Sequence, residues 1–375
     1  MNKQQIKSLL DKGELWNYII IDELNKKHVG DVESKEIVFL STIGRLVINK
    51  KPFSFNILIH SESSAGKDHL VESVLQLFPK EDIEAFGRIS KTCLTYIHNA
   101  KDEPLWTYDG KVLYLEEITE EVLNNEVMKV FTAGLSRSAI TKDQKAEVVE
   151  VKGKPVVICT TATTKPTPEI LNRFSIVKLD ESEEQTERTY MAEEEDYDED
   201  IIKFLGELKP YKIIISKEMK RKIGKIFPKG KVRYRREFPR FLDIIRAVTI
   251  FNQGKKPISN GEIISDWDDY DSAVSIFRSY RSGVSSIPLK REDKKIIEVL
   301  EKSEEPLSAR EILSEMEGYL SQMSIYKHLS NLTNHEILDS FDLRDNFNNP
   351  VIKYKISTEF ADKNPIQLPL YLELI

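Results

Sequence analysis

The sequence predicts an α/β fold built on a parallel, doubly wound sheet, and three features lead to this prediction. Short apolar segments that are typical of buried strands alternate with amphipathic segments of helical period between residues 51 and 182. The stretch FNILIHSESSAGKDHLVESVLQLFP joins one such strand to a helix through a loop of small residues. The stretch KVLYLEEI is a second apolar strand, and it ends in two carboxylates.

The composition is that of a globular protein with room for two or three domains. The chain has 375 residues, of which 40% are apolar and 31% charged, enough to build a sizeable core. Cys93 and Cys159 are far apart, which indicates neither a disulfide framework nor a zinc site and favours a reducing, cytoplasmic location. We expect no signal peptide and no membrane partner, because no apolar run approaches the roughly 20 residues of a membrane span.

Charge is unevenly distributed along the chain. The net charge of −7 by itself argues against nucleic-acid binding. However, residues 180–200 are strongly acidic and residues 217–240 are strongly basic. We interpret the acidic stretch as an exposed connector. The basic stretch is either a solvated helix face next to arginines that serve a nucleotide, or an electrostatic track for phosphates.

The pattern divides the chain into five regions. Residues 1–50 carry apolar residues at helical spacing and form a helical N-terminal segment. Residues 51–182 form the α/β core, and residues 183–282 form a helical lid. Residues 290–357 form a separate α+β module, and residues 358–375 form a C-terminal tail.

The α+β module has the layout of a winged helix, with three helices followed by two strands around a polar tip. Ser308 is well placed to cap the second helix. Ile325, Leu329 and Leu332 of the third helix are predicted to pack inward. The side chains that could face a DNA groove are Tyr326, Lys327, Ser330 and Asn331, of which Lys327 and Asn331 are the chosen DNA-binding candidates. Such modules bind duplex DNA or other proteins, and both alternatives stay open.

The loop in SESSAGKD approaches the phosphate-binding pattern G-x-x-x-x-G-K-[ST]. Its backbone N–H groups and Lys67 would bind the phosphates of ATP. Two positions depart from the pattern, since Ser61 replaces the first glycine and Asp68 replaces the hydroxyl residue that binds Mg²⁺. A carboxylate is a hard oxygen ligand, so Asp68 could hold the metal directly. The candidate nucleotide-binding residues are Ser61, Glu62, Ser63, Ser64, Ala65, Gly66, Lys67, Asp68 and His69. The alternative is a chance Ser/Gly loop.

The acidic end of KVLYLEEI has the form of a Walker B strand. In that interpretation Glu116 positions Mg²⁺ together with Asp68, and Glu117 orients the attacking water. The alternative is a strand that exits to solvent with two charges. The third strand, PVVICTTAT, ends in Thr160 and Thr161. A polar residue there could contact the γ-phosphate, and Thr161 is the candidate.

With these motifs the chain resembles AAA+ ATPases of the replicative-helicase kind over roughly residues 15–255. The likeness is greatest to the minichromosome-maintenance (MCM) group, and it extends to the helicase parts of primase-helicase proteins of mobile elements. SSAGKDHL matches the mobile-element form SSAGKS except at Asp68. GRISKTCLTYI is similar to the segment that precedes Walker B there. The first 50 residues are too short for the MCM N-terminal domain with its oligonucleotide-binding barrel and zinc, and we expect no primase part.

The resemblance implies roles for further basic residues. RSAITKDQKAEVVEV falls where MCM proteins carry a hairpin whose lysine touches DNA in the central channel, and it implies this role for Lys142 and Lys145. EILNRFSIVKL is similar to the segment that carries the arginine finger, which implies that Arg173 completes the site of a neighbouring subunit. RYRREFPRFLDIIRAVTIF is similar to the helix that carries sensor 2, which implies this role for Arg240, with Arg236 as the alternative.

The function implied by the resemblance is that of an AAA+ P-loop ATPase. It would form a ring, as a hexamer, and couple hydrolysis of ATP with Mg²⁺ to helicase or translocase movement on single-stranded DNA. It would act in the replication of a mobile element, virus or plasmid. The alternative is an ATP-binding assembly or regulatory DNA-binding protein with little hydrolysis, because Asp68 could impair the metal site.

Overall fold

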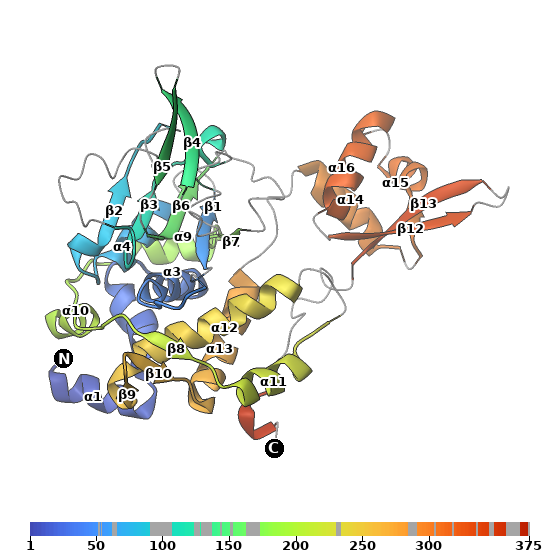
Figure 1. Cartoon of the computed structure of the whole chain (residues 1–375). Coiled ribbons are helices and arrows are strands. Elements are labelled where there is room, and N and C mark those ends of the chain that lie inside the picture. The colour runs from blue at the N-terminus through green and yellow to red at the C-terminus, as the bar shows by residue number, and fades with distance from the viewer. Residues whose placement is uncertain are drawn as a thin grey trace. The chain divides into compact units, whose positions relative to one another are not determined.

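The computed structural model of the chain describes most of its residues (Figure 1). The described residues are 1–51, 53, 55–61, 66–90, 107–123, 128, 137–142, 145–150, 153–162, 173–229, 234–283, 291–303, 305–316, 319–334, 337–344, 349–357 and 368–373. They belong to two compact units, which we describe separately. The first comprises Met1–Val284 together with Leu368–Ile375, and the second comprises Ser285–Gln367.

A parallel sheet of five strands lies at the centre of the first unit, which confirms the predicted α/β fold. Its order is β2-β3-β6-β1-β7. The strands are β1 (Asn56–His60), β2 (Ile83–Phe86), β3 (Val112–Leu115), β6 (Val156–Thr161) and β7 (Phe174–Val177). Strands β1, β3, β6 and β7 are almost wholly buried, as is typical of a parallel sheet that is covered on both faces. The sequence patterns that define β1, β3, β6 and β7 were recognised, whereas β2 was not.

The strand order decides which chain segments meet at the edge where the strands end. β6 lies between β1 and β3, so β1 and β3 are not neighbours. Thr161 at the end of β6 is in register with His60 at the end of β1. The loop after β1, the carboxylates after β3 and the threonines of β6 therefore gather at one edge of the sheet.

The N-terminal segment is helical, and its helix at Val32–Gly44 packs against β1 and β6 of the sheet. Its helices are α1 (Lys3–Lys12), α2 (Leu15–Tyr18) with a π-helical turn at Ile19–Glu23 and a 3₁₀ turn at Leu24–Lys26, and α3 (Val32–Gly44). α1 begins with a capping box, in which Asn2 and Gln5 exchange hydrogen bonds between side chain and backbone. α3 is buried almost throughout, because it contacts β1, β6, α4, α12 and α13.

Two helices and a hairpin follow strands of the sheet. α4 (Lys67–Leu75) begins directly after the loop that follows β1, and the short helix α6 (Glu120–Leu123) follows β3. β4 (Arg137–Lys142) and β5 (Lys145–Glu150) form an antiparallel hairpin. Figure 1 shows this hairpin projecting away from the five-stranded sheet.

The region predicted as a lid is mainly helical but contains a small sheet. Its helices are α9 (Glu183–Tyr190), α10 (Glu199–Gly206), α11 (Lys217–Ile226), α12 (Tyr234–Phe251) and α13 (Trp267–Gly283). The small sheet has the order β8-β10-β9 and consists of Lys212–Ile214, Glu262–Ile264 and Ile258–Ser259. Within the described part of the chain, none of the helices combines the length and apolar character that crossing a bilayer requires.

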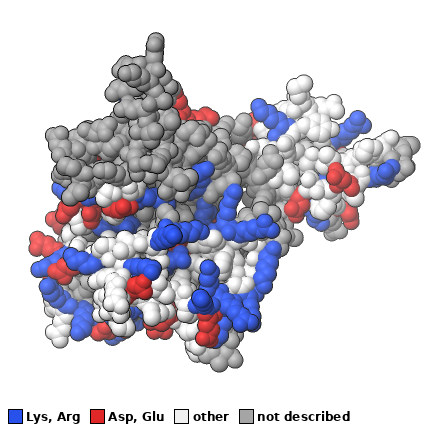
Figure 2. All heavy atoms as spheres, in the orientation of Figure 1, with Lys and Arg blue, Asp and Glu red and all other residues white. Residues whose placement is uncertain are grey.

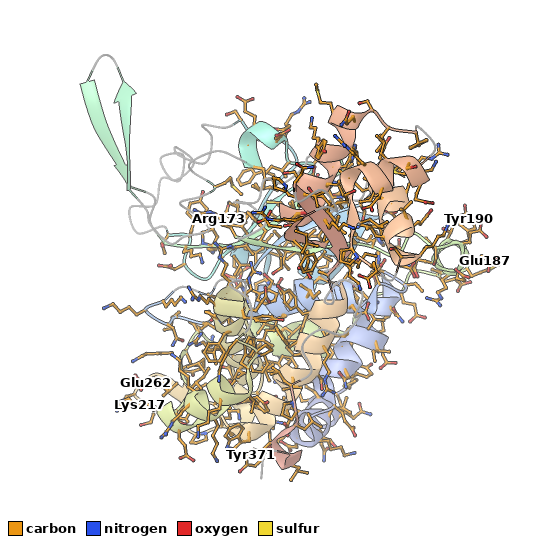
Figure 3. All side chains as sticks on the ribbon, turned by 90° about the vertical axis from the view of Figure 1, so that its right-hand side faces the viewer. Arg173, Glu187, Tyr190, Lys217, Glu262 and Tyr371 are labelled. Carbon is orange, nitrogen blue, oxygen red and sulfur yellow. The ribbon has the colours of Figure 1, made fainter. Side chains whose placement is uncertain are left out.

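The interpretation of the acidic stretch as a connector is wrong for its first half, which forms α9. The side chain of Ser182 caps this helix by accepting a hydrogen bond from the backbone N–H of Gln185 over 3.2 Å. Glu183 and Glu184 lie in the first turn, where the helix dipole favours negative charge. Figure 3 shows Glu187 and Tyr190 projecting outward from this helix.

The segment predicted as a tail packs on the helical region of the first unit. The ring of Tyr371 stacks on Trp267 with centroids 4.5 Å apart and an angle of 12° between the planes. The backbone N–H of Tyr371 donates to Asp271 over 2.7 Å, and the hydroxyl of Tyr270 donates to the carbonyl of Pro369 over 2.8 Å. The chain therefore returns from the second unit to the first, and Figure 3 shows Tyr371 at the end of the first unit where it returns.

The second unit contains three helices and one antiparallel sheet. Its elements are α14 (Arg291–Glu301), β11 (Leu307–Ser308), α15 (Ala309–Glu315), α16 (Gln322–Asn334), β12 (Leu338–Arg344) and β13 (Pro350–Ile356), with the sheet order β11-β13-β12. Ser308 caps α15 in a capping box with Glu311. Ile325, Leu329 and Leu332 of α16 lie in the core of this unit, as predicted.

Candidate functional site

The candidate site lies where β1 leads into α4. Gly66 precedes the helix with φ = 83°, a left-handed conformation that glycine adopts without the steric cost of a side chain. Lys67 is the first residue of α4, so its backbone lies at the positive end of the helix dipole. Glu62–Ala65 lie outside the described residues.

Ser61 shows why the first glycine of the pattern can be replaced. Its φ is not positive, so a side chain is tolerated at this position. Its hydroxyl is buried and accepts a hydrogen bond from the backbone N–H of Leu179 over 3.0 Å. Ser61 therefore ties the start of the loop to the segment that follows β7.

Lys67 reaches across the sheet edge to the end of β3. Its side chain is only 4% exposed, and its ammonium group forms an ion pair with the carboxylate of Glu117, which is half-exposed. Glu117 has φ = 40°, an unusual conformation for a residue with a side chain. Its backbone N–H donates to the hydroxyl of Thr160 over 3.1 Å, which helps to hold this strained turn.

Asp68 is bound by two hydroxyl groups from the sheet. The hydroxyl of Thr160 donates to Oδ1 of Asp68 over 2.5 Å, and the hydroxyl of Tyr114 donates to the same oxygen over 3.0 Å. Tyr114 and Thr160 are almost completely buried. Burial and the nearby charge of Asp68 raise the pKa of the Tyr114 hydroxyl, which therefore stays protonated as a donor.

Glu116 is the second carboxylate near Asp68. Its backbone N–H donates to the carbonyl of Phe86 on β2 over 3.0 Å. Burial, together with the charges of Asp68 and Glu72, raises the pKa of its carboxyl group. A divalent cation would relieve this repulsion, and carboxylate oxygens are the ligands that Mg²⁺ prefers, so the donor set fits Mg²⁺. Among the described residues, no group of three or more His, Cys, Asp or Glu side chains could hold a metal ion, so these two carboxylates would bind the cation only together with other ligands.

The two threonines at the end of β6 have different surroundings. Thr160, not Thr161, donates to Asp68 and accepts from Glu117. Thr161, the residue chosen from the sequence as the γ-phosphate sensor, is buried as well. Successive side chains of a strand point to opposite faces, so Thr161 is directed to the other face of β6.

The two arginines chosen as nucleotide contacts lie away from Lys67. Arg173 directly precedes β7, and Phe174 at the start of β7 is in register with Asn56 at the start of β1. Arg240 donates to the carbonyl of Phe174 over 3.3 Å and forms an ion pair with Glu237. Both arginines therefore lie at the edge of the sheet opposite to the loop after β1.

Arg240 is buried and held by its own region of the fold. Its guanidinium also donates to the hydroxyl of Tyr280 on α13 over 3.3 Å. In this structure it does not reach the site around Lys67. Arg236, the alternative for the same role, is exposed on the first turn of α12.

A cavity of about 620 Å³ adjoins Gly66. One of its lining residues, His28, was not indicated by the sequence motifs. Its lining includes His28 from the N-terminal segment, His69 from α4 and Gln185 from α9. Nδ1 of His28 lies 3.1 Å from Nδ1 of His69, and Nε2 of His28 lies 2.8 Å from Asp31. Burial and the neighbouring His28 lower the pKa of His69. A cavity of this size suits a small-molecule ligand.

The candidate DNA-binding residues are distributed over separate elements. Lys142 and Lys145 are paired at the end of the β4–β5 hairpin, beside residues 143–144, which are not described. Lys327 and Asn331 are exposed on α16 of the second unit. Lysine and arginine side chains also gather over α11, at the lower right of the first unit in Figure 2. The exposed basic residues of α11 are Lys217, Lys220, Arg221, Lys222 and Lys225.

Comparison with known proteins identifies a P-loop domain in this chain. A sequence-family model described as the MTBMA_p00010 P-loop domain matches residues 1–224, more than half of the chain. The matched part contains the loop after β1 and the carboxylates after β3. No match was found among curated proteins.

Proposed function

Since this chain belongs to the MTBMA_p00010 P-loop domain family and has a P-loop NTPase core, we propose that it is an ATPase of the AAA+ class that moves along DNA. The observation that carries this proposal is the meeting of Lys67 at the start of α4 with Glu117 at the end of β3. A phosphate-binding lysine and a carboxylate that orients water must lie on either side of a γ-phosphate, and these two side chains already meet at that edge.

Each residue of the site has a separate role in the hydrolysis of ATP. The start of α4 and Lys67 bind the phosphates of ATP, and the cavity beside His28 and His69 receives the base and ribose. Arrival of the phosphates draws Lys67 away from Glu117, and the released carboxylate is then available to orient the attacking water. Asp68 and Glu116 would hold Mg²⁺, which supplies charge neutralisation on the phosphates when bound.

The order of the sheet supports the AAA+ class within the P-loop proteins. A strand that ends in polar residues lies between the strand of the phosphate loop and the strand that ends in carboxylates. A helical region follows the core, as expected for a lid. Because Arg173 lies at the far edge of the sheet, it is suited to the site of a neighbouring subunit rather than to its own. We therefore propose a ring, most simply a hexamer, in which Arg173 acts in trans.

Three features support movement on DNA. The β4–β5 hairpin carries Lys142 and Lys145 at its paired end, the place of the lysine in a channel loop. The exposed basic face of α11 offers a phosphate track. The second unit has the element order and the β11-β13-β12 sheet of a winged helix, with Lys327 and Asn331 exposed on its third helix. By its resemblance to MCM-like helicases, the protein would act in the replication of a mobile element, virus or plasmid.

The test is ATP hydrolysis by the full chain with and without single-stranded DNA. We expect turnover that requires Mg²⁺ and rises several-fold with DNA, and DNA affinity that falls steeply with salt. The double variant K142A/K145A should lose the stimulation by DNA. A rate of ATP hydrolysis that does not change with DNA would refute the proposed movement along DNA. It would not refute the nucleotide site.

A second candidate function is an ATP-binding assembly or regulatory protein with little hydrolysis. Asp68 stands where the phosphate loop usually has a hydroxyl residue. The observation that favours this candidate is that two buried hydroxyl groups already donate to Oδ1 of Asp68. Tight ATP binding without turnover, with and without DNA, would support this candidate against the motor.

A further inference from the structure

Tyr114 has the only polar side-chain group in the buried strand β3. β3 reads VLYL, and all four side chains are buried. Phenylalanine would fill the same space, whereas a buried tyrosine hydroxyl needs an acceptor. The acceptor is Oδ1 of Asp68, which lies on a different element, 3.0 Å away.

Two donors converge on one oxygen of Asp68. The Thr160 hydroxyl donates to the same Oδ1 over 2.5 Å, and Thr160 is fully buried. A carboxylate oxygen accepts about two hydrogen bonds, so these hydroxyls use the accepting capacity of Oδ1. They also fix the side-chain rotamer of Asp68 at the start of α4. The other oxygen, Oδ2, then belongs to a carboxylate whose orientation is set.

We propose that Tyr114 and Thr160 are positioning residues that turn Asp68 into a direct ligand of the divalent cation that accompanies ATP. In the ordinary phosphate loop a neutral hydroxyl fills this position. Here Tyr114 and Asp68 form a matched pair, because one hydroxyl on β3 holds the carboxylate that replaces the loop hydroxyl. This inference rests on the proposed function, since it assumes that the site binds ATP with a cation.

The experiment measures the metal dependence of nucleotide affinity rather than turnover. The dissociation constant of a fluorescent ATP analogue is determined for the full chain with Mg²⁺ and with a chelator. The constant measured with the chelator, divided by the constant measured with Mg²⁺, gives a ratio that reports how much the cation contributes. In Tyr114→Phe, which removes a single hydroxyl, this ratio should fall on the order of tenfold. Thr160→Val, which removes the other donor, should lower the ratio in the same direction.

Two comparisons separate positioning from general destabilisation. Tyr197 is another buried tyrosine whose hydroxyl donates to α4, but it donates to the carbonyl of Ser73 over 3.0 Å. Tyr197→Phe should leave the ratio unchanged. In an Asp68→Ser background, which restores the ordinary hydroxyl, Tyr114→Phe should change the ratio by less than about twofold, because the two effects are coupled through Asp68.

The outcomes distinguish this inference from the proposed function. A ratio in Tyr114→Phe equal to that of the wild type, with ATP still bound, overturns the inference alone. So does an equal fall in Tyr197→Phe, because it indicates a general effect on α4. A wild-type chain that binds no ATP with Mg²⁺ overturns the inference and the proposed function together.

Discussion

The ammonium group of Lys67 and the carboxylate of Glu117 form an ion pair between the first turn of α4 and the turn after β3. Lys67 is buried and Glu117 is half-exposed, so the pair lies at the boundary between the core and the solvent. In a phosphate-binding site these charges have separate partners, since the phosphates attract Lys67 and the attacking water needs Glu117. If the site binds nucleotide as proposed, the phosphates have to separate this ion pair.

Replacing Lys67 with alanine should remove most of the affinity for ATP. The variant loses the cation that binds the phosphates and leaves Glu117 without its partner. We expect nucleotide affinity to fall on the order of 100-fold in an equilibrium binding assay. Lys80→Ala, which removes an exposed lysine, is the matched control and should bind ATP normally. Equal affinities for the two variants would place the phosphates elsewhere.

Glu117→Gln should separate binding from hydrolysis. Glutamine keeps the size of the side chain but cannot polarise water as a carboxylate does, and we expect turnover to fall by about 100-fold or more. ATP should bind at least as tightly as to the wild type, because the phosphates no longer compete with a carboxylate for Lys67. Single-turnover hydrolysis and equilibrium binding measure the two effects. Glu120→Gln, at an exposed glutamate nearby, serves as the control, and undiminished turnover in Glu117→Gln would exclude the proposed base.

Arg240→Ala should act on stability. Arg240 is buried among Glu237, Tyr280 and the carbonyl of Phe174, and its removal leaves the Glu237 carboxylate buried without this cation. We expect a loss of about 3 kcal/mol in the free energy of unfolding, measured by chemical denaturation. Arg236→Ala, at an exposed position on the same helix, should change the stability little. A stable Arg240→Ala variant with defective hydrolysis would instead show that Arg240 acts on the nucleotide.

Tyr371→Ala tests the return of the chain to the first unit. The variant removes the stacked ring on Trp267, and we expect the first unit to lose about 1 kcal/mol of stability. Leu372→Ala provides a control at the next position, because Leu372 is 83% exposed. Thermal unfolding of both variants gives the comparison. Identical melting temperatures would show that the stacking of Tyr371 on Trp267 contributes no stability.

The free energy of unfolding should decrease at acidic pH because of His69, which lines the cavity beside Gly66. In the folded chain burial and the adjacent His28 lower the pKa of His69, whereas in the unfolded chain the ring takes up a proton near its ordinary value of 6.5. The unfolded state therefore binds more protons in this range, and stability falls as the pH drops from about 6.5 through the lowered pKa. The charged neighbours Glu194, Glu72 and Lys27 also act on the ring, with the carboxylates opposing the shift.

The measurement is the change in the free energy of unfolding between pH 7.5 and pH 5.5. His69→Asn should lose less stability over this interval than the wild type, since the other titrating groups are common to both chains and cancel in the difference. An equal loss in the two chains would show that His69 is not responsible.

The local patterns of the sequence were sufficient for most of the first unit. A strand, a glycine-lysine loop and an amphipathic helix follow one another in Asn56–Leu75, and each has its own periodicity and composition. The same holds for β3 with its terminal carboxylates. β2 was missed because Ile83–Phe86 is a short edge strand that is only partly buried, so its sequence lacks the apolar run of its neighbours. α9 was missed because its side chains are mostly charged and exposed, and its signal was the cap at Ser182.

The residues that complete the site could not be read from the sequence in the same way. Tyr114 was the single side chain with a polar group in the buried strand VLYL, which was the available signal, but its acceptor depends on the strand order. His28 reaches His69 only because the N-terminal segment packs beside α4. Arg240 occupies the position that a motif indicated, yet it is directed to the start of β7.

By itself, the sequence determined that this protein has a phosphate-binding loop, an acidic strand end and an α/β core, because these features depend on residues that are close together along the chain. The tertiary structure alone decided that Thr160 rather than Thr161 contacts Asp68, that Lys67 meets Glu117, and that the last residues return to the first unit. The physical reason is that strand order and helix packing choose which distant side chains become neighbours. Local periodicity assigns a side chain to a face but does not name its partner.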